Sequence, residues 1–95
     1  MESILDTTKG VCFLCGRHCQ THKHHVFGGP NRWRSERDGL TLYLCPECHR
    51  TVHSDFRYAK GLRMIAETEW LTTRGAKIAD FIAEYGKNYL EVWHE

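Results

Sequence analysis

Two close pairs of cysteines constrain the fold of this chain more than any other feature. Cys12 and Cys15 form one C-x2-C pair, and Cys45 and Cys48 form the second. Pairs at this spacing, separated by a few tens of residues, are typical of zinc ribbons. Four thiolates complete a tetrahedral zinc site and leave no open position. We therefore predict a structural zinc that joins the N-terminal region to the middle of the chain.

The length of the chain explains why a metal would be needed. Ninety-five residues predict one domain, residues 1–95. A domain of this size buries only about 60–65% of the surface of its unfolded chain. A structural metal is one of the few ways to supplement so small a hydrophobic core.

A secreted disulfide scaffold is the alternative use of several cysteines, but three features favour zinc. The number of cysteines is odd, which leaves Cys19 as a reduced thiol outside the two pairs. The start, Met1–Asp6, lacks the basic end and apolar run of a signal peptide. The C-x2-C spacing itself is that of metal sites. We expect a reducing, cytoplasmic setting, and no stretch approaches the roughly 20 apolar residues of a membrane helix.

Turn residues and hydrophobic periodicity predict a small α+β fold. Residues 10–55 are expected to form a zinc-stapled core, and residues 56–95 a C-terminal helical extension of about two helices. Glycines separate these two helices at Gly75 and end the second at Gly86. The elements expected in the core are a zinc knuckle at 10–16, a strand at 22–27, a loop at 28–30, an exposed charged loop at 31–38, a strand at 40–44 and a helix beginning at Pro46.

Histidines are unusually frequent, and their spacing suggests a second site. His24 and His25 are neighbours on the first predicted strand, so their side chains point to opposite faces. A bend at the following glycines would bring both toward one cleft. His49 and His53 are four residues apart on the predicted helix and share one face. Each histidine alone is more simply a solvated side chain, but the four together predict a metal-binding and catalytic site.

This set of motifs resembles the HNH endonucleases of the ββα-metal superfamily, most of all the short phage-type members with a four-cysteine zinc site. The double histidine followed by a His-x3-His helix is also similar to the nuclease domains of DNase-type colicins. The resemblance covers residues 10–55, and the helical tail resembles small phage HNH proteins more loosely. It implies a ββα-metal core and hydrolysis of DNA phosphodiester bonds with low sequence specificity. The motifs that carry it are His24-His25-Val26, Gly28-Gly29 and Leu42-x-Leu44-Cys45-x2-Cys48-His49-x3-His53.

The resemblance also implies a role for each histidine. His25 matches the general base, which takes a proton from the attacking water. His24 and His49 match ligands of the catalytic metal, and His53 matches a third ligand or a contact to the scissile phosphate. The implied metal is Mg²⁺ or Mn²⁺, although three imidazoles also attract Zn²⁺ or Ni²⁺. The implied products carry a 5′ phosphate and a 3′ hydroxyl.

The chain departs from the family pattern at one position. The middle asparagine of the HNH motif lies five residues before the zinc-site cysteine, and here that position is Leu40. In the family this asparagine braces the loop that carries the base and does no proton chemistry. Asn31 and Asp38 are the candidates to replace it.

The charge distribution favours a nucleic-acid partner for the first part of the chain. Residues 1–64 hold ten Lys or Arg against six Asp or Glu, a net +4, and residues 65–95 hold three against six, a net −3. A basic surface around the metal motifs is expected if it meets phosphate. We predict phosphate contacts for Arg50, Arg32 and Arg34, with Trp33 stacking against a base. The alternative is a solvated, mixed-charge loop.

The interpretation implies DNA as the partner of a monomer or homodimer without membrane attachment, in the host cytoplasm if the protein is phage-encoded. The main alternative is a non-catalytic zinc module on a degenerate HNH fold that binds nucleic acid or protein. His25 separates the two, because a binding module has no use for a free imidazole beside a metal ligand. A third reading, compatible with cleavage, has the helices from Lys60 onward docking on a phage packaging or recombination protein.

Overall fold

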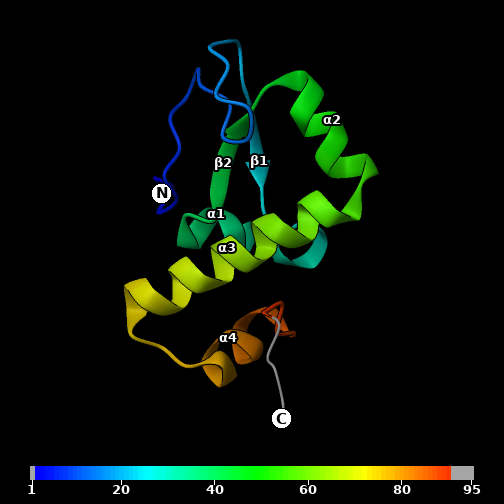
Figure 1. The fold of residues 1–95 in the computed structure, drawn as a ribbon. Helices are drawn as coiled ribbons and strands as arrows, with labels where there is room; N and C mark the ends of the chain where they lie inside the picture. Colours follow the sequence, from blue (N-terminus) through cyan, green and yellow to red (C-terminus); the bar gives the residue numbers. More distant parts are fainter. Residues whose placement is uncertain (1, 91–95) are drawn as a thin grey trace.

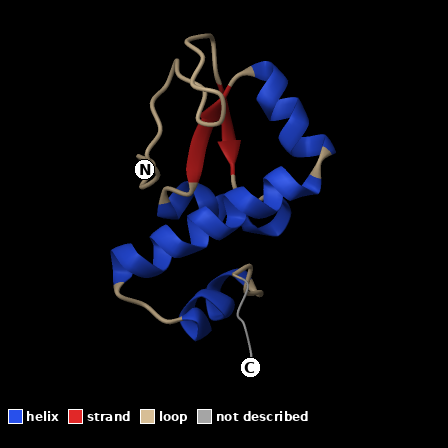
Figure 2. Ribbon diagram, in the orientation of Figure 1, coloured by secondary structure: helices blue, strands red, loops and turns tan. Residues whose placement is uncertain are grey.

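The computed structural model describes residues 2–90, which form a small α+β fold (Figure 1; Figure 2). The longest helix crosses below a two-stranded sheet, and a shorter helix stands beside the strands (Figure 1). In chain order the elements are β1 (His22–His25), the 3₁₀ helix η1 (Gly29–Asn31), α1 (Arg32–Asp38), β2 (Thr41–Leu44), α2 (Pro46–Ser54), α3 (Phe56–Arg74) and α4 (Ile78–Tyr85).

The two strands pair antiparallel, with His24 opposite Leu42 and His25 opposite Thr41. Leu42 and Leu44 are fully buried, because residues two apart on a strand share a face. Both strands lie where the sequence predicts them, but β1 is shorter than predicted and ends at His25. The next two residues, 26 and 27, turn into the core instead of extending the sheet.

The segment between the strands corrects one prediction. Residues 31–38 were expected to form an exposed loop, whereas η1 and α1 occupy it. Gly39 ends α1 with a left-handed backbone (φ 72°), and its N–H donates to the carbonyl of Ser35. Ser35 and Asp38, three residues apart on one helix face, are both buried. Helix formation therefore depends on tertiary burial of two polar residues, which the hydrophobic pattern cannot reveal.

The N-terminal region forms a compact turn against the sheet, as the predicted zinc knuckle requires. Isolated bridges join Val11 to Thr8 and to His18. The N–H of Cys12 donates to the carbonyl of Arg17 at 2.9 Å, and the N–H of Phe13 donates to Tyr43 of β2 at 2.8 Å. The knuckle is thus attached directly to the second strand.

The helices after the sheet follow the predicted pattern. Pro46 occupies the first turn of α2, and left-handed glycines, Gly75 and Gly86, end α3 and α4. Asp55 separates α2 from α3, and its side chain accepts a hydrogen bond from the N–H of Arg57. Among residues 2–90, no helix has the length and apolar character that crossing a membrane requires.

One hydrophobic core joins the sheet to the C-terminal helices. Four aromatic rings pack at its centre, with centroids of contacting rings 4.5–6.2 Å apart: Phe27 from the turn after β1, Trp70 from α3, and Phe81 and Tyr85 from α4. The buried apolar side chains are Leu5, Cys12, Val26, Phe27, Leu40, Leu42, Leu44, Cys45, Val52, Leu62, Ala66, Trp70, Phe81 and Tyr85.

A buried carboxylate, Asp38, ties α1 to α3 and α4. It receives hydrogen bonds from the indole of Trp70 at 3.1 Å and from the hydroxyl of Tyr85 at 2.7 Å. Arg37 and Arg74 form ion pairs with its other oxygen at 2.7 and 3.0 Å. Burial raises the pKa of Asp38, but the hydrogen bonds from Arg37, Tyr85 and Trp70 outweigh it and lower the pKa to about 2. Asp38 is therefore ionised and fully partnered at neutral pH.

We predict that Asp38→Ala lowers the free energy of unfolding by about 3–5 kcal/mol, because it leaves buried donors and cations without their acceptor. Denaturant unfolding of zinc-loaded protein measures the change. Glu84→Ala is the control, since it removes only the exposed ion pair with Arg37 and should cost less than about 1 kcal/mol. Equal effects of the two substitutions would contradict this role for Asp38.

Candidate metal centres

The four paired cysteines converge on one point. Cys12 and Cys15 come from the knuckle, Cys45 from the end of β2 and Cys48 from the first turn of α2. Their sulfur atoms all lie within 4.8 Å of one another. The sulfurs of Cys15 and Cys45 are 3.9 Å apart, and ligands of a tetrahedral zinc with bonds of about 2.3 Å lie about 3.8 Å apart. The geometry fits a structural zinc.

Local electrostatics also favour a cation between these sulfurs. The backbone N–H groups of Cys15 and Cys48 approach the sulfurs of Cys12 and Cys45 at 3.5 and 3.4 Å. Although burial raises it, backbone hydrogen bonds lower the pKa of Cys12 to about 6. Burial and the neighbouring thiols raise the pKa of Cys48, because several thiolates this close repel one another. A dication would remove that repulsion. Cys19 is half-buried and stays outside the cluster.

Three histidines form a second cluster at the junction of β1 and α2. His24 comes from the strand, and His49 and His53 come from one face of the helix. One ring nitrogen from each lies within 4.8 Å of the others. The Nε2 atoms of His49 and His53 are 3.1 Å apart, and imidazole nitrogens that share a metal at 2.0–2.1 Å lie about 3.0–3.4 Å apart. The three side chains fit a divalent transition metal.

The protonation state of this cluster suits metal binding. Burial first, and then the neighbouring His49 and His53, lower the pKa of His24 to about 4. Burial and His53 also lower the pKa of His49. Neutral imidazoles present lone pairs, so both side chains are ready to coordinate a cation at neutral pH without first losing a proton.

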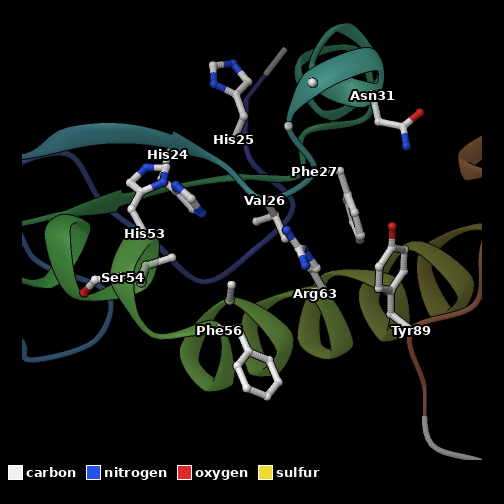
Figure 3. A pocket seen from close by; sticks show the side chains of 14 residues that line it. His24, His25, Val26, Phe27, Asn31, His53, Ser54, Phe56, Arg63 and Tyr89 are labelled. Carbon is white, nitrogen blue, oxygen red and sulfur yellow. The ribbon is translucent and has the colours of Figure 1, made fainter.

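His25 lies beside the cluster but makes a different contact. Figure 3 shows its ring apart from those of His24 and His53, as expected for neighbours on a strand. All three side chains nevertheless line one cavity of about 380 Å³, together with His49 and Arg32. His24 and His25 therefore line one cavity although their rings lie apart.

Glu36 of α1 sets the orientation of His25. Its Oε2 lies 2.8 Å from Nε2 of His25, and its Oε1 forms an ion pair of 2.8 Å with Lys23. The hydrogen bonds with Lys23 and with His25 lower the pKa of Glu36 to about 2. An ionised carboxylate only accepts hydrogen bonds, so Nε2 of His25 must carry a proton. Nδ1 of the neutral ring is then the nitrogen that can accept one.

The predicted phosphate-binding residues lie in different places. Arg32 lines the cavity with the histidines. Arg34 instead donates to Asn31 at 2.9 Å and packs on the exposed ring of Trp33 at 4.5 Å. Arg50 is exposed on α2 and lines none of the described cavities around the cluster. Of the three predicted arginines, only Arg32 lines a cavity with the histidine cluster.

The bracing role for which the sequence offered Asn31 or Asp38 falls to Ser35. Its hydroxyl accepts from the N–H of Phe27 at 3.0 Å and donates to the carbonyl of Phe27 at 2.8 Å. These two bonds brace the turn that follows His25. Neither predicted substitute does so: the side chain of Asn31 bonds to Arg34 and Tyr85, and that of Asp38 is part of the core.

Two further side chains near the cluster escaped the sequence prediction. Nδ1 of His22 lies 3.2 Å from Nδ1 of His49, on the side away from His53. The sequence could have indicated His22, because it lies two residues before His24 on the same strand and such residues share a face. Glu36 gave no signal, because its segment was predicted to be a loop.

Comparisons of the chain with protein-family models, curated proteins and solved structures find no significant match. The functional case therefore rests on the geometry of the two clusters and on the spacing of the motifs.

Proposed function

We propose that this protein is a metal-dependent endonuclease of the HNH type that hydrolyses phosphodiester bonds in DNA. One observation carries the proposal: the three-histidine cluster and His25 line the same cavity of about 380 Å³. The order of the elements supports it, because β1, β2 and α2 occur in this order, with η1 and α1 between the two strands and the four-cysteine cluster at the β2–α2 junction. This order matches the ββα core that the motif resemblance implies.

In this proposal the chain supplies both proton transfer and charge neutralisation. Nδ1 of His25 takes a proton from water as the water oxygen bonds to phosphorus, and Glu36 stabilises the resulting imidazolium. The bond between phosphorus and the 3′ oxygen breaks, and that oxygen takes up a proton from solvent. Arg32 neutralises charge on the non-bridging oxygens. A divalent ion held by His24, His49 and His53, proposed to be Mn²⁺ or Mg²⁺ with Zn²⁺ or Ni²⁺ as the alternatives that three imidazoles favour, would act as a Lewis acid toward the phosphate and the leaving oxygen.

The expected products give the test of this proposal. End-labelled DNA, single-stranded and duplex, is incubated with zinc-loaded protein and Mg²⁺ or Mn²⁺. We expect internal cuts whose fragments carry a 5′ phosphate and a 3′ hydroxyl, so that DNA ligase can rejoin nicks without prior kinase treatment. EDTA should stop the reaction. Absence of cleavage by folded protein, or fragments with 3′ phosphates, would contradict the proposal and favour a non-catalytic binding module.

We predict that Glu36→Gln lowers the cleavage rate by about 10–100-fold, because a neutral amide no longer fixes the Nε2–H tautomer or stabilises the imidazolium. Steady-state cleavage of a labelled oligonucleotide measures the effect. Lys23→Gln is the matched control: it removes the other ion pair of Glu36 but keeps the contact with His25. If the two substitutions have the same small effect, Glu36 has no part in the reaction.

A further inference from the structure

A second and larger cavity opens beside the proposed reaction site. It has a volume of about 580 Å³, and it shares His24, His25 and His53 with the smaller cavity. Figure 3 shows it as a cleft with the histidines at one end, Tyr89 at the other and Arg63 between them. A molecule that occupies this cleft would therefore lie directly against the three-histidine cluster.

Arg63 gives the cleft a positive charge at its centre. The residue is half-buried on α3, and its guanidinium lies 5.7 Å from the ring centroid of Tyr89. Among residues 2–90, no ion pair joins Arg63 to a carboxylate. A guanidinium in a cleft, with no carboxylate partner in the described part of the chain, is suited to phosphate oxygens.

A strongly exposed aromatic side chain from the start of α3 also borders the cleft. Phe56, the first residue of α3, lines the cavity and is 74% exposed, more than any other large apolar side chain in the described part of the chain. Exposed aromatic rings beside cationic grooves serve as stacking platforms for nucleic-acid bases. The cleft thus combines part of the three-histidine cluster, the guanidinium of Arg63 and an aromatic surface for stacking.

We propose that this cleft holds one unpaired nucleotide next to the scissile phosphate, with Arg63 on the adjacent phosphate and Phe56 stacked on the base. A base within a duplex has both faces covered by its neighbours and cannot stack on a side chain. The volume lies in the range of about 300–1,000 Å³ that holds a single small ligand. The preferred substrate class is therefore DNA with a single-stranded segment, such as a flap, a gap or a free strand. This inference rests on the proposed endonuclease function.

Binding measured without turnover tests the cleft separately from catalysis. Fluorescence anisotropy is recorded without added Mg²⁺ or Mn²⁺, with zinc-loaded protein, for a labelled 20-nucleotide strand, the same sequence as a duplex, and the same sequence as a 5′ flap. We expect at least ten-fold tighter binding of the strand and the flap than of the duplex. Arg63→Gln and Phe56→Ala should each weaken binding of the strand by about ten-fold, because the first removes a phosphate contact and the second a stacking surface.

Matched controls lie on the same helix. Arg57→Gln and Tyr58→Ala remove an exposed cation and an exposed aromatic ring that do not line the cleft. Both should leave binding of the strand within two-fold. Arg63→Lys keeps the charge without the planar fork and should give an intermediate loss. Thermal unfolding identifies any variant that fails to fold.

The outcomes separate the cleft from the chemistry. Loss of strand binding in the two cleft variants, with the controls unchanged, supports the proposal that the cleft binds a nucleotide, even if no metal yields cleavage. A different outcome is DNA cleavage that is equally fast on duplex and strand and unaffected by Arg63→Gln and Phe56→Ala. That result would overturn the nucleotide-binding role of the cleft and leave the endonuclease proposal standing. Equal weakening by the controls also overturns it.

Discussion

Cys45→Ser protein should lose its structural zinc and its cooperative thermal transition. Structural zinc contributes about 10–16 kcal/mol to the folding of small zinc domains near pH 7. The whole stability of a small domain is roughly 5–15 kcal/mol. Loss of the metal is therefore expected to unfold the protein at room temperature, which is the largest effect that we predict for any single substitution.

The position of Cys45 explains why the effect should be specific to the metal. Cys45 is fully buried at the N-terminus of α2, where its sulfur accepts a hydrogen bond from the N–H of Cys48. Serine is nearly the same size and is itself a favoured residue at this capping position. The substitution thus preserves the cap and the packing while it removes a thiolate ligand. Since His49 follows Cys48 directly, unfolding here would also displace the histidine cluster.

Circular dichroism during heating, together with the zinc content of purified protein, measures this prediction. Cys19→Ser is the control, because Cys19 lies outside the cluster and its substitution should change the free energy of unfolding by no more than about 1 kcal/mol. A Cys45→Ser protein that melts at the original temperature and still binds one zinc would show that the four sulfurs do not form a structural site.

His25→Ala should lower DNA cleavage by about 10²–10⁴-fold and leave metal binding unchanged. The reason is that the two neighbouring histidines on β1 make different contacts. His24 belongs to the cluster with His49 and His53, whereas His25 contacts Glu36 and contributes no atom to the cluster. Removing His25 therefore takes away the proposed proton acceptor but none of the ligands.

His53→Ala is the informative comparison, because it should reduce both cleavage and the affinity for the second metal. Isothermal titration with Mn²⁺ or Ni²⁺ into zinc-loaded protein measures that affinity. His18→Ala serves as the control for loss of an exposed histidine outside the cavities. Equal loss of metal affinity in His25→Ala and His53→Ala would contradict the separate roles of the two residues.

The metal clusters could be predicted from the sequence because local geometry fixes their spacing. A C-x2-C turn brings two sulfurs together wherever it occurs, and His49 and His53 share a face on any helix. The strand positions of His24 and the cysteine at the end of β2 followed from alternation and from the glycines around them. Local geometry does not say which segments meet: the motif resemblance, not spacing alone, implied that His24 joins His49 and His53.

The environment of His25 could not be predicted, because it depends on distant partners. Helix α1 is stabilised by Asp38, whose partners Trp70 and Tyr85 lie 32 and 47 residues further along the chain. Only that helix brings Glu36 to His25. The segment is rich in charged residues, and nothing in its own composition distinguishes it from a solvated loop. The bracing role of Ser35 could not be predicted for the same reason, because it also depends on helix α1.

The most direct test of the central proposal is the conversion of supercoiled plasmid by purified, zinc-loaded protein. Samples contain Mg²⁺, Mn²⁺ or EDTA, with His25→Ala protein of verified zinc content alongside. We predict nicked plasmid with Mg²⁺ or Mn²⁺, none with EDTA, and a rate at least 100-fold lower for His25→Ala, in line with the loss of a general base. Intact plasmid with every divalent metal, or equal nicking by His25→Ala, would contradict a His25-dependent endonuclease.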